Sequence, residues 1–94
     1  MIESEKKLER RLKKEVEARG GMCIKLEANF IAGLPDRMCL LPGGQVFFVE
    51  VKTTGKQPSP VQYAVHRMLI KLGFRVYVPD TTEKIKNIID VERG

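Results

Sequence analysis

The sequence predicts an α/β fold with a mixed central sheet flanked by helices. Apolar residues recur at helical spacing in three segments, and four short stretches have the alternating or continuous apolar pattern of strands. A Pro-Gly-Gly turn between two of these stretches predicts an antiparallel hairpin. The 94 residues are expected to form one domain, residues 1–94, with a core of modest size.

We expect the chain to begin with a helix over residues 4–19. Ser4 is a suitable N-cap because its hydroxyl can accept a hydrogen bond from the first turn. Gly20 and Gly21 end the helix, since glycine tolerates the left-handed backbone that follows a last helical turn. The buried stripe has i,i+4 spacing and consists of Leu8, Leu12 and Val16.

Three strands are expected next. Residues 22–28 form the first, residues 29–35 a loop, and residues 36–41 a short second strand. The tight turn at residues 42–44 makes residues 45–52 the hairpin partner of the second strand. Because the strand 45–52 is apolar on both faces, we expect it in the centre of a covered sheet. The apolar side of the first strand consists of Met22, Ile24 and Leu26.

A second helix follows a polar loop at residues 53–58. Ser59 is its expected N-cap and Pro60 its first helical residue, a position that proline favours. The helix is expected to run to about Leu72, where Gly73 ends it. Its expected buried side consists of Val61, Val65, Met68 and Leu72.

The last two elements are a strand and a helix. Residues 75–78 form the fourth strand, which Pro79 ends, and Thr81 or Thr82 caps a final helix that ends near Val91. The side chains that this helix turns inward are Ile85, Ile88 and Ile89. The complete order is αβββαβ followed by a C-terminal helix, which a mixed sheet with flanking helices accommodates naturally.

The composition favours an anionic partner. A net charge of +5 and a pI of about 9.4 are typical of nucleic-acid-binding proteins, although the basic residues of the first helix alternate with glutamates and equally fit a solvated face. No apolar run approaches the roughly 20 residues of a membrane helix, and the N-terminus lacks a secretion signal. We therefore expect an intracellular protein in which Cys23 and Cys39 are buried, reduced thiols and not zinc ligands.

Charged residues end the most apolar strand and carry the candidate chemistry. Strand side chains alternate, so Glu50 and Lys52 share one face while Val51 points into the core. Pairing across the hairpin turn places Asp36 opposite residues near Glu50, so two carboxylates converge. Two such charges call for a hard divalent cation, and Mg²⁺ suits carboxylates, waters and a phosphate oxygen. Lys52 can orient an attacking water or stabilise charge on a phosphate.

Each part of this pattern also has a simpler explanation. A Glu-x-Lys pair on a strand is usually a surface ion pair, and a Pro-Asp pair is usually a turn. The agreement of order, spacing and placement favours the catalytic interpretation, because phosphodiester hydrolysis needs a cation beside the developing negative charge.

The motifs together resemble the VRR-NUC (virus-type replication-repair nuclease) family of the PD-(D/E)XK superfamily. The resemblance rests on Gly-Leu-Pro-Asp-Arg at residues 33–37, Phe-Phe-Val-Glu-Val-Lys at residues 47–52, Gly-Lys at residues 55–56 and Pro-Ser-Pro-x-Gln at residues 58–62. It implies a restriction-endonuclease-like αβββαβ core, dependence on Mg²⁺ or Mn²⁺, and DNA endonuclease activity. Small members of the family resemble homodimers that act on four-way (Holliday) junctions in bacterial or phage-infected cytoplasm.

The resemblance also implies roles for individual residues. Asp36 and Glu50 match metal ligands, the backbone carbonyl of Val51 matches a further ligand, and Lys52 matches the catalytic lysine. Gln62 matches a recurrent glutamine that lies near the metal site or the DNA.

An acidic residue on the first helix is also expected in the site. Glu5 and Glu9 share one helical face, and we prefer Glu9, which lies next to the buried stripe. A solvated ion pair of Glu9 with Lys13 or Arg10 is the structural alternative.

Three further polar residues lie near these motifs in the sequence. Lys56 is expected to contact phosphate, although a loop lysine is equally consistent with no role. Tyr63 is expected in the core in preference to a base-stacking position. His66 is expected to be solvated and is given no role.

Two alternatives to junction cleavage remain open at this point. The same site can act on flaps, nicks, duplex or single strands, because a fold and its site do not fix the substrate. A DNA-binding module without catalysis is the other, and the complete set of Asp36, Glu50 and Lys52 argues against it.

Overall fold

The computed structural model describes residues 1–27 and 31–93. Its elements follow the expected order, with boundaries that differ by a few residues: α1 (Glu5–Ala18), β1 (Met22–Lys25), β2 (Arg37–Leu41), β3 (Gln45–Val49), α2 (Pro60–Lys71), β4 (Arg75–Tyr77) and α3 (Thr82–Glu92). The expected end of the first strand at Ala28 and the start of the loop at Asn29 lie outside the described residues. None of the helices in the described part of the chain is long and apolar enough to span a membrane.

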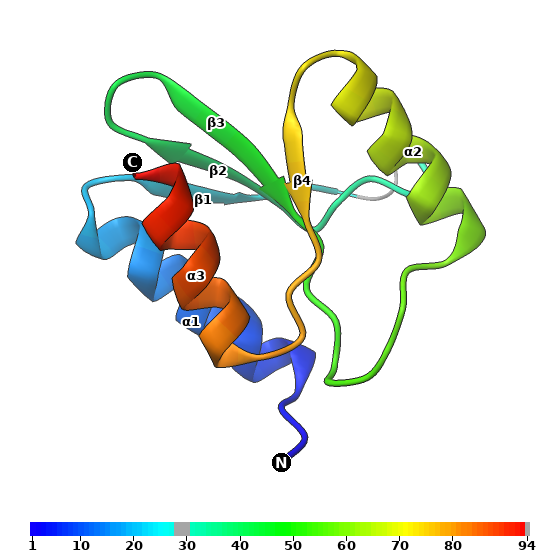
Figure 1. The fold of residues 1–94 in the computed structure, drawn as a ribbon, viewed down its shortest axis with the longest axis horizontal. Helices are drawn as coiled ribbons and strands as arrows, with labels where there is room; N and C mark the ends of the chain where they lie inside the picture. Colours follow the sequence, from blue (N-terminus) through cyan, green and yellow to red (C-terminus); the bar gives the residue numbers. More distant parts are fainter. Residues whose placement is uncertain (28–30, 94) are drawn as a thin grey trace.

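The four strands form one mixed sheet in the order β1-β2-β3-β4 (Figure 1). β1, β2 and β3 are antiparallel neighbours, and β4 pairs parallel to β3. The prediction that the most apolar strand lies inside the sheet is therefore confirmed for β3. A parallel pair needs a long crossover, and α2 is part of that connection.

The core fills one face of the sheet. α1 and α3 run beside each other there (Figure 1), and both predicted apolar stripes are buried. Burying each large aliphatic side chain contributes roughly 2 kcal/mol to stability. The buried side chains of the two helices are Leu8, Leu12, Val16, Ile85, Ile88 and Ile89. Those of the sheet and the chain after β3 are Cys39, Leu41, Phe47, Val49 and Val51.

The helix starts agree with the sequence prediction. Ser4, Ser59 and Thr81 each accept a hydrogen bond on the side-chain oxygen from the backbone N–H three residues later. The two cysteines are also free, as expected, with Cys39 buried and Cys23 half-buried opposite it on β1.

The predicted buried side of α2 is wrong. Val61 is 50% exposed, Met68 is 64% exposed and Leu72 is 74% exposed, while Val65 is half-buried. The one buried residue of α2 is His66, which had been expected in solvent. The physical reason is the position of the helix, which packs against β4 and not against the core of α1 and α3.

The sheet face opposite α1 and α3 is only partly covered. Phe48 on this face is buried beneath Phe74, with an edge-to-face ring contact at 5.5 Å between centroids. Phe74 itself is 38% exposed, and Met22 on β1 is 60% exposed. Because α2 lies beside β4 (Figure 1), it leaves apolar side chains of this face and of its own surface in solvent.

Gly33 allows the loop before β2 to pass close to α2. Its φ is +88°, and a Cβ atom built there would lie 2.5 Å from the carbonyl oxygen of Val61. Any side chain at this position would push the loop away from α2, and Asp36 follows three residues later.

We expect Gly33→Ala to destabilise the protein more than Gly43→Ala. Gly43 also has a positive φ of +90°, but its Cβ would meet no atom within 4 Å. Alanine at Gly43 should cost about 1–2 kcal/mol in backbone strain, and alanine at Gly33 should cost about 1–3 kcal/mol more because of the clash. Urea unfolding of both variants measures the difference, and equal losses would contradict the close contact.

Candidate active site

The chain stays extended beyond the last residue of β3. The backbone N–H of Glu50 donates to the carbonyl of Tyr77 at 2.9 Å, and the N–H of Lys52 donates to the carbonyl of Pro79 at 3.1 Å. The N–H groups of two residues that are two positions apart therefore bond to carbonyls that are also two positions apart on one neighbouring segment, as in a strand. Glu50 and Lys52 lie on the sheet face of α2, while Val51 is fully buried in the core, as the alternation predicted.

Asp36 meets this segment from β2. Arg37 pairs with Val49, so the residue before β2 lies opposite the residue after β3. The Oδ2 atom of Asp36 accepts a hydrogen bond from the backbone N–H of Val51 at 3.0 Å. The structure thus brings Asp36 to the end of β3, where the sequence placed it.

Glu50 lies at the centre of the resulting cluster and is only 1% exposed. Its Oε2 accepts a hydrogen bond from Nε2 of Gln62 at 3.1 Å and lies 3.6 Å from Nζ of Lys52. Its Oε1 lies 3.8 Å from Nε2 of His66. A carboxylate, an ammonium, an amide and an imidazole therefore converge at one point.

Burial changes the acidity of both carboxyl groups. Desolvation, followed by the nearby charge of Asp36, raises the pKa of Glu50 to about 7. Desolvation also raises the pKa of Asp36, and the hydrogen bond from Val51 partly offsets this. Two carboxylates whose negative charges oppose each other in a poorly solvated place are stabilised by a cation between them.

The oxygen atoms at this point fit a hard cation. The carboxylates of Asp36 and Glu50 supply oxygen atoms here, and the carbonyl oxygen of the adjacent Val51 accepts no hydrogen bond from the described residues. No group of three His, Cys, Asp or Glu side chains capable of holding a metal occurs in residues 1–27 and 31–93. Two carboxylates are nevertheless enough for Mg²⁺, because this ion is commonly held by one or two carboxylates and keeps several waters.

The loop after Lys52 is held in place by hydrogen bonds of Thr54. The side chain of Lys52 is 16% exposed. Thr54 donates its backbone N–H to the carbonyl of Glu3 and its hydroxyl to the carbonyl of Asp80. These contacts join the loop to Glu3, before α1, and to Asp80, before α3.

The side-chain amide of Gln62 makes two hydrogen bonds, and its place in the first turn of α2 explains both. Its Oε1 accepts a hydrogen bond from the backbone N–H of Ser59 at 2.8 Å, which completes a capping box. The same amide therefore turns its Nε2 toward Glu50. The structure thus places Gln62 beside the carboxylate of Glu50.

Glu9 lies near the cluster through Arg37. Its Oε1 is 3.1 Å from Nε of Arg37, so its partner is on β2 and not Lys13 or Arg10 on its own helix. The charges of Glu9 and, more weakly, Glu5 raise the pKa of Asp36. Of the two glutamates, Glu9 has the larger effect on the pKa of Asp36.

The sequence left the position of one residue near the site open and predicted the burial of two others wrongly. Lys56 is exposed on the loop after the site. Tyr63 is 41% exposed and donates its hydroxyl to Gln57, so its expected core position is wrong. His66 is 5% exposed and joins the cluster. Its one sequence signal was a spacing of four residues from Gln62, which places both on the same face of α2.

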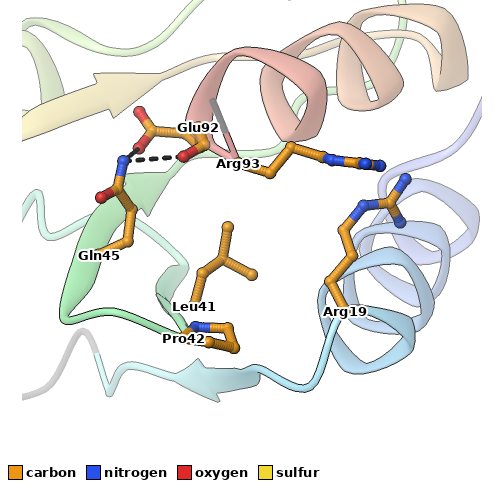
Figure 2. A pocket seen from close by; sticks show the side chains of 6 residues that line it. All are labelled: Arg19, Leu41, Pro42, Gln45, Glu92 and Arg93. Carbon is orange, nitrogen blue, oxygen red and sulfur yellow. Dashed lines mark hydrogen bonds between the residues drawn. The ribbon is translucent and has the colours of Figure 1, made fainter.

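A pocket of about 390 Å³ lies at the other end of the β2–β3 hairpin (Figure 2). Its lining residues are Arg19, Leu41, Pro42, Gln45, Glu92 and Arg93. Glu92 is bonded to Gln45, Arg75 and Tyr77. Arg19 is bonded to the carboxylate and carbonyl of Glu15 near the end of α1. Glu92 therefore ties α3 to the sheet, whereas the bonds of Arg19 stay within the end of α1, and none of the lining residues belongs to the cluster around Glu50.

Comparison with known proteins gives two likenesses that extend over most of the chain. The chain is 38% identical over 79 residues to "Putative nuclease p44" of Acyrthosiphon pisum secondary endosymbiont phage 1, covering 84% of this chain and 85% of that protein. A solved structure described as a VRR_NUC domain is similar with a TM-score of 0.85 and 30% identity, covering 94% of this chain and 97% of that one. No protein-family model matches the chain.

We expect Glu50 to make the metal-free protein less stable as the pH rises. Its pKa of about 7 lies above the ordinary value of 4.5, so the folded chain favours the protonated carboxyl. The stability that this proton contributes is complete below about pH 4.5 and is lost as the pH rises through about 7. Relative to Glu50→Gln, the wild type should lose on the order of 1–3 kcal/mol between about pH 5 and pH 8.

Urea unfolding in EDTA measures this difference, with Glu17→Gln on the exposed face of α1 as the control. The stability of the control should follow that of the wild type at each pH. If the stability of the wild type and that of Glu50→Gln changed in parallel with pH, the pKa of Glu50 would not be raised in the folded protein.

Proposed function

Since this chain belongs to the VRR-NUC family of nucleases, we propose that it is a Mg²⁺-dependent DNA endonuclease that prefers four-way (Holliday) junctions. The observation that carries the proposal is the meeting of Asp36, Glu50 and Lys52 at the ends of β2 and β3. The net charge of +5 favours a polyanionic substrate. Its place of action is the interior of the cell, as the sequence predicted.

The chain's own groups account for the parts that hydrolysis needs. Asp36, Glu50 and the carbonyl of Val51 would hold Mg²⁺, which supplies a Lewis acid and lowers the pKa of a bound water; Mn²⁺ should substitute for it. Lys52, 3.6 Å from Glu50, would orient the attacking water or stabilise charge on the phosphate. The attacking water loses a proton to solvent as its oxygen forms a bond to phosphorus, the bond from phosphorus to the leaving sugar oxygen breaks, and that oxygen takes up a proton from solvent.

Three residues would act around this centre. Glu9 would help to set the charge beside Asp36 through its contact with Arg37. Gln62 would hold Oε2 of Glu50 and face the DNA. Lys56, exposed on the loop after the catalytic lysine, would contact a phosphate.

A homodimer would complete the function, because resolving a junction needs two symmetric cuts and a two-fold dimer supplies two sites. The partly covered sheet face and α2 favour self-association, since Met22, Met68 and Leu72 all expose apolar side chains there. A second copy on this surface would also add core to a small protein.

The deciding experiment compares four-way junction, flap, nicked duplex, duplex and single-stranded DNA, each with Mg²⁺ and with EDTA. We expect Mg²⁺-dependent cleavage, fastest on the junction. Faster cleavage of a flap or nick would replace the junction as the substrate and leave the chemistry intact. Binding of DNA without cleavage of any form would identify a binding module and contradict the proposed enzyme.

Glu50→Gln and Lys52→Ala should both lose cleavage by about 100-fold or more, because each removes a group that acts on the developing charge. Circular dichroism should show that both variants fold. Lys52→Ala should still bind the junction in Ca²⁺, and this binding should weaken as salt rises. Wild-type rates in either folded variant would remove that residue from the mechanism.

Leu72→Glu should convert the dimer to a monomer, because it introduces a charge into the proposed contact. Val91→Glu is the matched control, since Val91 is 68% exposed on α3, in the other layer of the fold. Sedimentation velocity should give a dimer for the wild type and for Val91→Glu. A dimeric Leu72→Glu would place the contact elsewhere, and a monomeric wild type would exclude it.

A further inference from the structure

His66 is buried in a helix whose apolar residues are largely exposed. Among the twelve residues of α2, it is the one that is buried, at 5% exposure. Polar side chains rarely take such a place without a partner, because burial removes their hydrogen bonds to water. The question is therefore what holds His66 inside.

The imidazole faces an oxygen that also lacks a partner. Nε2 of His66 lies 3.8 Å from Oε1 of Glu50, and neither atom has a hydrogen-bond partner among the described residues. Both atoms are shielded from solvent. The separation exceeds a hydrogen bond by less than about 1 Å, so a small side-chain movement would join a donor to an acceptor.

Glu50 has one fixed oxygen and one free oxygen. Gln62 and Lys52 both lie beside Oε2. Rotation about the last bond of a glutamate is soft, so contacts to a single oxygen do not fix the plane of the carboxylate. Gln62 is already oriented by its bond to Ser59, and His66 is one helical turn further along the same face. One helix can thus hold both oxygens.

We propose that His66 is a positioning residue that donates its Nε2–H to Oε1 of Glu50 and, together with Gln62, fixes the carboxylate for the metal ion. The inference rests on the proposed function, because it assigns Glu50 to metal binding. Loss of this bond should weaken metal binding by about 10- to 100-fold, as is usual for groups that orient a ligand.

Amide substitutions distinguish positioning from simple packing. The amide nitrogen of glutamine reaches the place of Nε2, whereas that of asparagine reaches only the place of Nδ1. His66→Gln should therefore keep most of the Mn²⁺ affinity, and His66→Asn and His66→Ala should lose it. Ile85→Val in the opposite layer serves as a control for mild destabilisation and should bind Mn²⁺ like the wild type.

Calorimetric titration of the purified protein with Mn²⁺ alone measures these affinities without DNA or turnover. Junction cleavage then separates kcat from KM, and the positioning role predicts a fall in kcat for His66→Asn with KM nearly unchanged. Wild-type Mn²⁺ affinity in His66→Ala, or equal losses in His66→Gln and His66→Asn, would overturn the inference while leaving the nuclease itself intact. Failure of the wild type to bind Mn²⁺ would overturn both proposals.

His66 also gives a direct spectroscopic readout, because it is the only histidine of the chain. The ¹⁵N shifts of an untagged protein report which ring nitrogen carries the proton. The inference requires a neutral ring with the proton on Nε2 and a changed signal in Glu50→Gln. A ring protonated on Nδ1 alone would exclude donation to Glu50.

Discussion

The structure depends on the hairpin that sets Asp36 against the end of β3. A backbone N–H, that of Val51, is bonded to a carboxylate where a ladder would otherwise continue. Because the acceptor is a side chain and not a main-chain carbonyl, this hydrogen bond brings a second negative charge beside Glu50, where little water can reach. Lys52 and Gln62 both contact the carboxylate of Glu50 and so offset part of the repulsion between the two carboxylates.

Much of this was accessible from the sequence because it depends on local periodicity. Alternation along residues 45–52 placed Glu50 and Lys52 on one face, and the turn length set the register that brings Asp36 opposite. The helices α1 and α3 were also predictable, since their apolar stripes pack on the same core. The family resemblance, confirmed by two relatives, follows from the same motifs.

The face of α2 could not be predicted in the same way. Helical spacing identified an apolar stripe at Val61, Met68 and Leu72, and such a stripe normally points toward the core. Here an adjacent face, about a third of a turn away, points inward, because Gln62 and His66 reach the carboxylate of Glu50 on another element. The apolar periodicity of a helix does not show whether it packs on the core or contributes side chains to a polar site. The burial of His66 was therefore visible only in the tertiary structure.

The order in which the elements are joined has a consequence for synthesis on the ribosome. Glu50 and Lys52 bond through their backbone to Tyr77 and Pro79, and Glu3 bonds to Thr82 near the other end of the chain. A nascent chain that has emerged only as far as Lys52 already carries Asp36, Glu50 and Lys52 but none of these supports. The cluster around Glu50 therefore gains these supports only after the ribosome has passed Thr82.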